Sequence, residues 1–66
     1  MNEDEPKWLE LIIGKDFSRF VRYSDVISIT YRGDRISVST AALEKLEARE
    51  LYLCDFFGRR QVKLMR

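Results

Sequence analysis

The sequence is poor in the residues that usually hold a very small protein together. Its 66 residues include no histidine, one cysteine and one proline. A single cysteine excludes an internal disulfide, and one thiolate without histidine cannot build a closed tetrahedral zinc site. A core made by so short a chain rarely contributes more than about 3–5 kcal/mol by itself. We therefore expect a partner, most simply a second copy forming a homodimer, to complete the fold.

The absence of histidine also removes most catalytic arrangements. No Ser–His or Cys–His pair is available to activate a nucleophile, and the three glycines are too far apart to form a phosphate-binding loop. Cys54 lies in an apolar run, which is typical of a buried small hydrophobe. The aspartates Asp25, Asp34 and Asp55 each lie beside a turn or strand end, where aspartate has a local structural role. The chain alone is predicted to be no enzyme and to hold no metal, cofactor or small-molecule substrate.

Long apolar runs are absent as well. No run approaches the roughly 18 residues that a membrane-spanning helix needs, and no segment has the pattern of a signal peptide. We therefore expect no membrane association. One free cysteine without a secretion signal is typical of a reducing compartment, so the sequence predicts a cytoplasmic location.

The charged residues nearly balance but are unevenly placed. The formal net charge is +1, from 12 lysines and arginines and 11 acidic residues. Three of the acids lie at residues 3–5, directly before Pro6, and residues 1–6 are predicted to form a disordered acidic tail. Leaving these three acids out raises the net charge of residues 7–66, the expected single small domain, to +4. The excess of arginine over lysine suits forked contacts to phosphate or carboxylate, and it is also typical of a charge-rich thermophilic surface.

Alternating apolar and polar residues predict a mainly β structure. Six short strands are expected, separated by turns that contain glycine or aspartate. In the third strand, Ile27, Ile29 and Tyr31 are expected to point to the same face. The predicted strand ranges are 7–13, 17–23, 26–31, 36–38, 51–57 and 60–65.

One segment has the composition of a helix. For residues 40–50, Ser39 or Thr40 can serve as N-cap, and Ala41 and Ala42 favour helix. Leu43 and Leu46 would then share a face with Ala42 and pack on the sheet, because so short a helix is not stable alone. The predicted fold class is therefore mainly β (α+β): a small two-sheet β-sandwich of about six short strands, with one short helix between strands four and five.

Basic residues mark a candidate nucleic-acid surface. Three lie in the last predicted hairpin and two on the second predicted strand. Arginines on a β surface can hold phosphates, and each phosphate that they neutralise makes binding depend on salt. The alternative is a solvated face of a half-buried sheet, with the aromatic residues in the core. The candidate nucleic-acid-binding residues are Arg19, Arg22, Arg59, Arg60 and Lys63, and the aromatic residues weighed as core are Trp8, Phe17, Phe20, Phe56 and Phe57.

Three segments in the same order and spacing resemble a known family. They are Tyr23–Ile29 (YSDVISI), Ile36–Leu46 (ISVSTAALEKL) and Leu51–Arg59 (LYLCDFFGR). They are similar to a strand, a strand leading into a helix, and a strand and turn of the CRISPR-associated integrase that acquires spacers. The resemblance covers roughly Trp8 to Leu64, and the proline usual in the first of these signatures is absent.

The resemblance implies the N-terminal β-domain of that integrase. In the family this domain builds a homodimer and helps to hold DNA, whereas the metal-dependent endonuclease site belongs to a helical domain that would follow Arg66. None of the catalytic residues has a counterpart here. Two hypotheses follow: a non-catalytic domain that dimerises through exposed strands or residues 17–38 and positions DNA by backbone contact, or an independent small β-protein. The second would bind nucleic acid or a protein partner through its basic C-terminal hairpin.

Overall fold

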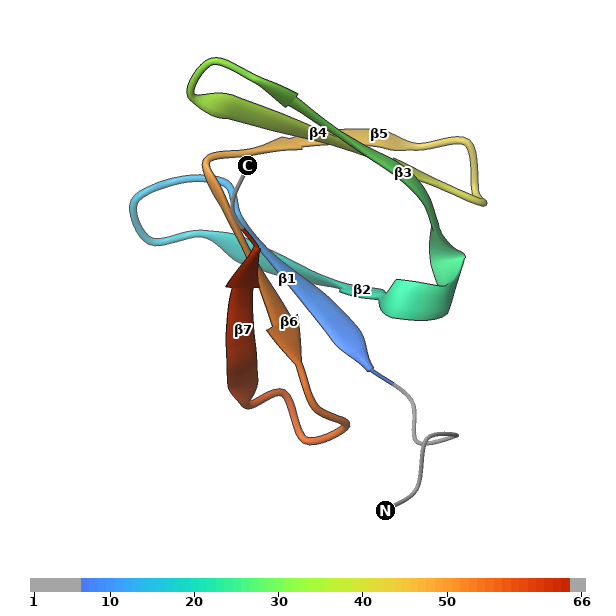
Figure 1. Cartoon of the computed structure of the whole chain (residues 1–66), viewed down its shortest axis with the longest axis vertical. Helices are drawn as coiled ribbons and strands as arrows, with labels where there is room; N and C mark the ends of the chain where they lie inside the picture. The colour runs from blue at the N-terminus through green and yellow to red at the C-terminus, as the bar shows by residue number, and fades with distance from the viewer. Residues whose placement is uncertain (1–6, 65–66) are drawn as a thin grey trace.

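The computed structural model describes residues 7–64, which form two antiparallel sheets that face each other (Figure 1). The four-stranded sheet has the order β2-β1-β6-β7, and the three-stranded sheet has the order β3-β4-β5. A single 3₁₀ turn, η1 (Tyr23–Asp25), leads from the first sheet into the second. The strands are β1 (Trp8–Ile12), β2 (Ser18–Arg22), β3 (Val26–Arg32), β4 (Arg35–Thr40), β5 (Lys45–Ala48), β6 (Glu50–Cys54) and β7 (Arg60–Leu64).

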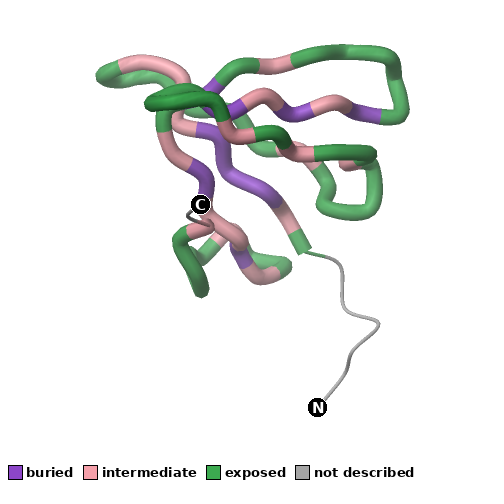
Figure 2. Tube along the Cα trace, turned by 45° about the horizontal axis from the view of Figure 1, so that its top comes forward, coloured by how far each residue is buried: buried purple, intermediate pink, exposed green. Residues whose placement is uncertain are grey.

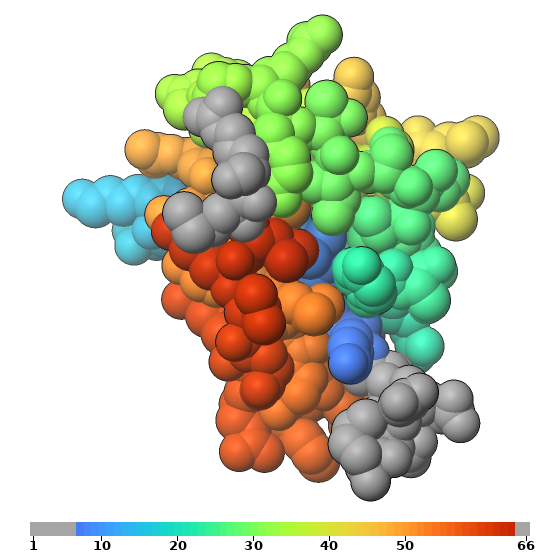
Figure 3. Space-filling view, viewed as in Figure 1, coloured from blue at the N-terminus to red at the C-terminus, as the bar shows by residue number. Residues whose placement is uncertain are grey.

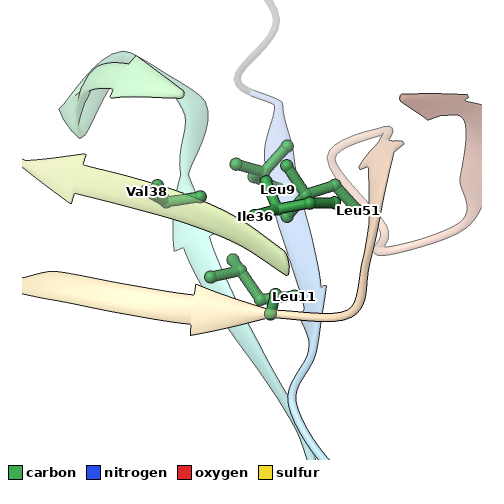
Figure 4. Close-up of a cluster of buried hydrophobic side chains, with 6 residues drawn as sticks. Leu9, Leu11, Ile36, Val38 and Leu51 are labelled. Atoms are coloured by element: carbon green, nitrogen blue, oxygen red, sulfur yellow. The ribbon is translucent and has the colours of Figure 1, made fainter. Parts of the chain in front are cut away.

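The core lies between the two sheets and is aliphatic. Successive side chains of a strand point to opposite faces, so Leu9 and Leu11 of β1 enter the core together. They meet Ile36 and Val38 of β4 and Leu51 of β6 (Figure 4). Figure 2 shows the buried stretches on these facing strands, while the connecting turns are exposed. The sequence-based fold class is confirmed: the chain is mainly β, with two packed sheets.

The predicted helix is wrong. The segment 40–50 contains the end of β4, a short turn, strand β5 and the first residue of β6. Strand β5 pairs with β4 in a register that brings Ala48 opposite Ile36 and Leu46 opposite Val38. This pairing buries the apolar side of the segment and satisfies its backbone, and so it overrides the local helix propensity of the alanines. The result is seven strands, and no helix within residues 7–64 has the length and apolarity needed to cross a membrane.

A β-bulge changes which side chains of the third strand face the core. The register with β4 shifts between Val26 and Ser28. The extra residue reverses the alternation at this point, so Val26 joins Ile29 and Tyr31 against the core. Ile27 is consequently turned outward and is 66% exposed. The prediction held for Ile29 and Tyr31 and was wrong for Ile27.

The predicted acidic tail, residues 1–6, lies outside the described residues.

The turn between β4 and β5 holds a leucine in an unfavourable conformation. Thr40 N–H donates to Glu44 O and Leu43 N–H donates to Thr40 O, both at 3.0 Å. This connection, residues 41–44, brings Leu43 to φ +64°, where glycine is the preferred residue. Leu43 is also 93% exposed, so its side chain gains no burial that would offset the strain.

Replacing this leucine should stabilise the fold. Leu43→Gly removes the positive-φ strain and adds flexibility to the unfolded chain, with a net gain of about 0.5–1 kcal/mol in the free energy of unfolding. Ala42→Gly is the matched control, because the residue before Leu43 has no positive φ, and it should destabilise by a similar amount. Urea denaturation followed by circular dichroism measures both. Equal destabilisation by the two substitutions would contradict the turn geometry.

Candidate functional site

The side of the four-stranded sheet that faces away from the core is called here the outer face. Because Leu9 and Leu11 point inward, Trp8 and Glu10 of β1 point outward. Trp8 lies opposite Arg22 of β2, and Glu10 lies between Phe20 of β2 and Tyr52 of β6. The outer face consists of the following residues: Trp8, Glu10, Phe20, Arg22, Tyr52, Arg60 and Lys63.

A buried carboxylate lies at the centre of the outer face. Glu10 is only 8% exposed. Arg60 covers it with a forked contact, in which Nε donates to Oε1 at 2.7 Å and Nη2 donates to Oε2 at 3.3 Å. The hydrogen bond to Glu10 raises the pKa of Arg60 above its ordinary value. The guanidinium group also lies over the ring of Tyr52, 4.1 Å from the ring centroid. Arg60 is therefore held as the structural counter-ion of Glu10.

Two further contacts extend this network along β6 and β7. The Tyr52 hydroxyl donates to Glu50 Oε1 at 3.2 Å. Lys63 Nζ lies 3.6 Å from Glu50 Oε2. Both the lysine and the arginine on this half of the outer face therefore have a carboxylate partner.

The other half of the outer face carries a shallow hollow, called here the aromatic cleft. It is lined by Trp8, Phe20, Phe56, Phe57 and Gly58. The Trp8 indole Nε1–H donates to the carbonyl of Phe56 at 3.2 Å, which fixes the indole against the β6–β7 turn. Phe56 and Phe57 meet edge to face, with ring centroids 5.4 Å apart. Figure 3 shows the blue start of β1 at the surface beside the orange β6–β7 segment and the teal end of β2.

The β6–β7 turn presents the two phenylalanines because of its local sequence. The side chain of Asp55 accepts hydrogen bonds at Oδ1 from the N–H groups of Phe57 (2.9 Å) and Arg59 (2.8 Å). Gly58 takes φ +83°, which a residue with a side chain rarely adopts. An ideal Cβ at Gly58 would lie 3.9 Å from the ring of Phe20, an ordinary contact distance, so the turn lies beside strand β2.

Two arginines flank the aromatic cleft. The guanidinium carbon of Arg22 lies 5.5 Å from the ring centroid of Trp8, and that of Arg59 lies 5.4 Å from the ring centroid of Phe57. Both distances are within the range of cation–π contacts. Arg59 also lies 3.5 Å from Asp55, whereas Arg22 has no carboxylate partner among residues 7–64.

The structure brings four of the five sequence-predicted cations to one side. Arg22, Arg60 and Lys63 lie on the outer face, and Arg59 lies in the adjoining turn. Arg19 does not join them, because it alternates with Phe20 on β2 and pairs with Glu44 at 3.1 Å. The ion pairs of the other predicted cations leave Arg22 as the only one of the five without a carboxylate partner in the described part of the chain.

Sequence reasoning assigned the aromatic residues to the core, and this was wrong for the phenylalanines. Phe17, Phe20, Phe56 and Phe57 are all exposed. The alternation of β2 contained a usable signal, because it puts Phe20 on the same face as Arg22. The sequence did not indicate that Phe20 lies beside the β6–β7 turn, because this proximity depends on the pairing of β1 with both β2 and β6.

Other parts of the described chain offer less chemistry. The prediction of a buried Cys54 is confirmed, and burial raises the pKa of its thiol above the ordinary value of 9.0, with the Glu10 carboxylate adding to the effect. A thiol of this kind is a weak nucleophile. Within residues 7–64, no three carboxylate or thiolate side chains come together as a metal site. A wider hollow, of about 710 Å³, is lined mainly by charged residues of both signs, without an aromatic ring.

Comparison with known proteins gives no match: neither a family model, nor a curated protein, nor a solved structure is similar to the chain. Residues 36–46 were compared above with a segment of the integrase in which a strand leads into a helix. In this chain they form most of β4, a turn and the beginning of β5. The aromatic cleft and its flanking arginines are therefore interpreted from their own geometry.

The contact between Glu10 and Arg60 can be tested through stability. Arg60→Met removes the counter-ion of a buried carboxylate, so we expect a clear fall in the melting temperature. Arg59→Met is the matched control, because its partner Asp55 is far less buried than Glu10 and remains bonded to the turn backbone, and it should change the melting temperature little. Thermal unfolding at neutral pH compares the two. Equal melting temperatures would contradict a structural role of Arg60.

Proposed function

We propose that this chain is a non-catalytic binding domain for nucleic acid, and that the outer face of its four-stranded sheet makes the contact. The observation that carries the proposal is the pairing of guanidinium groups with a half-buried and an exposed aromatic ring at one end of this face. Arg22 lies against Trp8 and Arg59 lies against Phe57. Interleaved rings and cations of this kind suit a partner that has both phosphates and planar bases.

The electrostatics of the domain agree with a polyanionic partner. Residues 7–64 carry 11 lysines and arginines and eight acidic residues, which gives a net charge of +3. The ion pairs neutralise much of the outer face, so only a few phosphate contacts are available. Arg22 and Arg59 are the best placed for them, since each guanidinium group lies within cation–π distance of a ring of the cleft and offers several N–H donors that suit a phosphate. We therefore expect binding with a modest salt dependence.

The proposal predicts a specific loss in the salt dependence. Arg22→Gln should remove one phosphate contact and lower the slope of log affinity against log salt by roughly 0.7–0.9. Arg32→Gln, at the end of β3 in the other sheet, is the matched control and should leave the slope unchanged. Fluorescence anisotropy with a short labelled oligonucleotide, titrated at several salt concentrations, measures both. Absence of binding at low salt, or equal slopes for both variants, would contradict the proposal.

A homodimer is the second candidate, and one observation favours it. Strand β3 is the longest strand, with seven residues, and in the described structure it pairs only with β4. Its outward Ile27 is exposed beside this free edge, and such an edge can pair with a second copy. This edge lies within residues 17–38, one of the regions through which the integrase-like domain is expected to dimerise.

Sedimentation equilibrium tests the dimer. We expect a concentration-dependent dimer, which Ile27→Lys weakens by placing a charge at the edge that would be buried. Val62→Lys serves as the control, because Val62 is also apolar and exposed but lies on β7 of the other sheet. It should leave the association unchanged. A wild-type chain that stays monomeric at the highest soluble concentration would exclude the homodimer.

A further inference from the structure

We infer that the aromatic cleft is a base-stacking site for single-stranded nucleic acid. This inference rests on the proposed function and names its substrate class. The bases would lie against the rings of Phe57, Phe56 and Phe20, and the flanking Arg22 and Arg59 would contact the phosphates on either side.

The distribution of aromatic side chains is the first argument. The buried core is aliphatic, and all four phenylalanines of this short chain are exposed. Phe57, at 70% exposure, is the most open member of the cleft. A chain with so little core would gain stability by burying these rings. Three of the four exposed phenylalanines instead gather in one hollow, which marks a surface that is covered by a partner.

The fixed geometry of the indole and of the turn backbone is the second argument. The Trp8 indole is held by its hydrogen bond to the Phe56 carbonyl, and the backbone N–H of Phe57 is held by Asp55. The turn lies beside Phe20 of strand β2, because a Cβ built at Gly58 would be in van der Waals contact with that ring. Stacking loses less conformational entropy on a surface whose backbone is already fixed, so the framework of the cleft is organised before a ligand arrives.

A single strand is the preferred ligand because stacking needs base faces that are free. In a duplex the base faces are already stacked on one another, so a protein ring reaches them only by opening the stack. A single strand presents free base faces, and its flexible backbone allows its phosphates to reach the arginines at both sides of the cleft. Stacking on an aromatic side chain tolerates any base, since every base has a flat π-face.

The cleft also lacks the groups that would read a base edge. The indole N–H of Trp8 is the one polar side-chain group among the five lining residues, and it is already bonded to the Phe56 carbonyl. We therefore expect little sequence preference. An apolar protein segment is a poorer occupant, because it would remove the guanidinium groups of Arg22 and Arg59 from water without offering them an acceptor.

The test uses the only tryptophan of the chain as its reporter, because Trp8 lies in the cleft. Oligothymidylate should quench the Trp8 emission and saturate. Phe57→Ala should weaken the binding by roughly 5- to 100-fold, and Phe57→Tyr should restore it. Phe17→Ala is the matched control, since Phe17 is 60% exposed at the opposite end of the β1–β2 hairpin, and its affinity should equal that of the wild type. Circular dichroism confirms that each variant is folded.

Two outcomes overturn the inference while the proposed function survives. One is a blunt duplex of the same length that competes as well as the single strand. The other is an unchanged affinity of the folded Phe57→Ala variant, which would leave phosphate contact alone. Competition by polyglutamate as effective as that by oligothymidylate would also overturn it, in favour of an acidic protein partner. If neither duplex nor single strand binds at low salt, the proposed function fails together with the inference.

Discussion

The strict alternation of side chains along β1 links the core of this protein to its candidate site. This strand lies between β2 and β6, so it supplies Leu9 and Leu11 to the space between the sheets and Trp8 and Glu10 to the outer face. A shift of one residue would exchange the two sets. The register of β1 is fixed from both faces of the sheet. Burial of the leucines fixes it on the core side, and the contact of Glu10 with Arg60 fixes it on the outer side.

The outer face is organised by its neutralised charges as much as by its exposed ones. Arg60 is committed to Glu10, and Lys63 lies close to Glu50, so these cations help to assemble β1, β6 and β7. The aromatic cleft then remains as the part of the face that the fold leaves uncovered. The binding that we propose for this surface would depend more on stacking than on net charge. This balance distinguishes it from a basic patch that follows a duplex backbone.

The sequence predicted the fold class and most of the strands, because alternation of apolar residues is a local signal. It failed for residues 40–50, where local propensity favours a helix and only the pairing with β4 decides for a strand. The bulge that turns Ile27 outward depends on one extra residue in the register, which periodicity does not reveal. The contact between Glu10 and Arg60 joins positions 50 residues apart. The charge pattern identified Arg22 and Arg59, but their position against aromatic rings follows from the order of strands in the sheet.

We propose the aromatic end of the outer face as the binding surface. Mapping the backbone amide signals by nuclear magnetic resonance during a titration with single-stranded oligothymidylate tests it most directly. We expect shifts to concentrate at the beginning of β1, at the end of β2 and in the β6–β7 turn, while the amide signals of β3, β4 and β5 do not move. Shifts that centre on the three-stranded sheet, or no shifts at low salt, would contradict it.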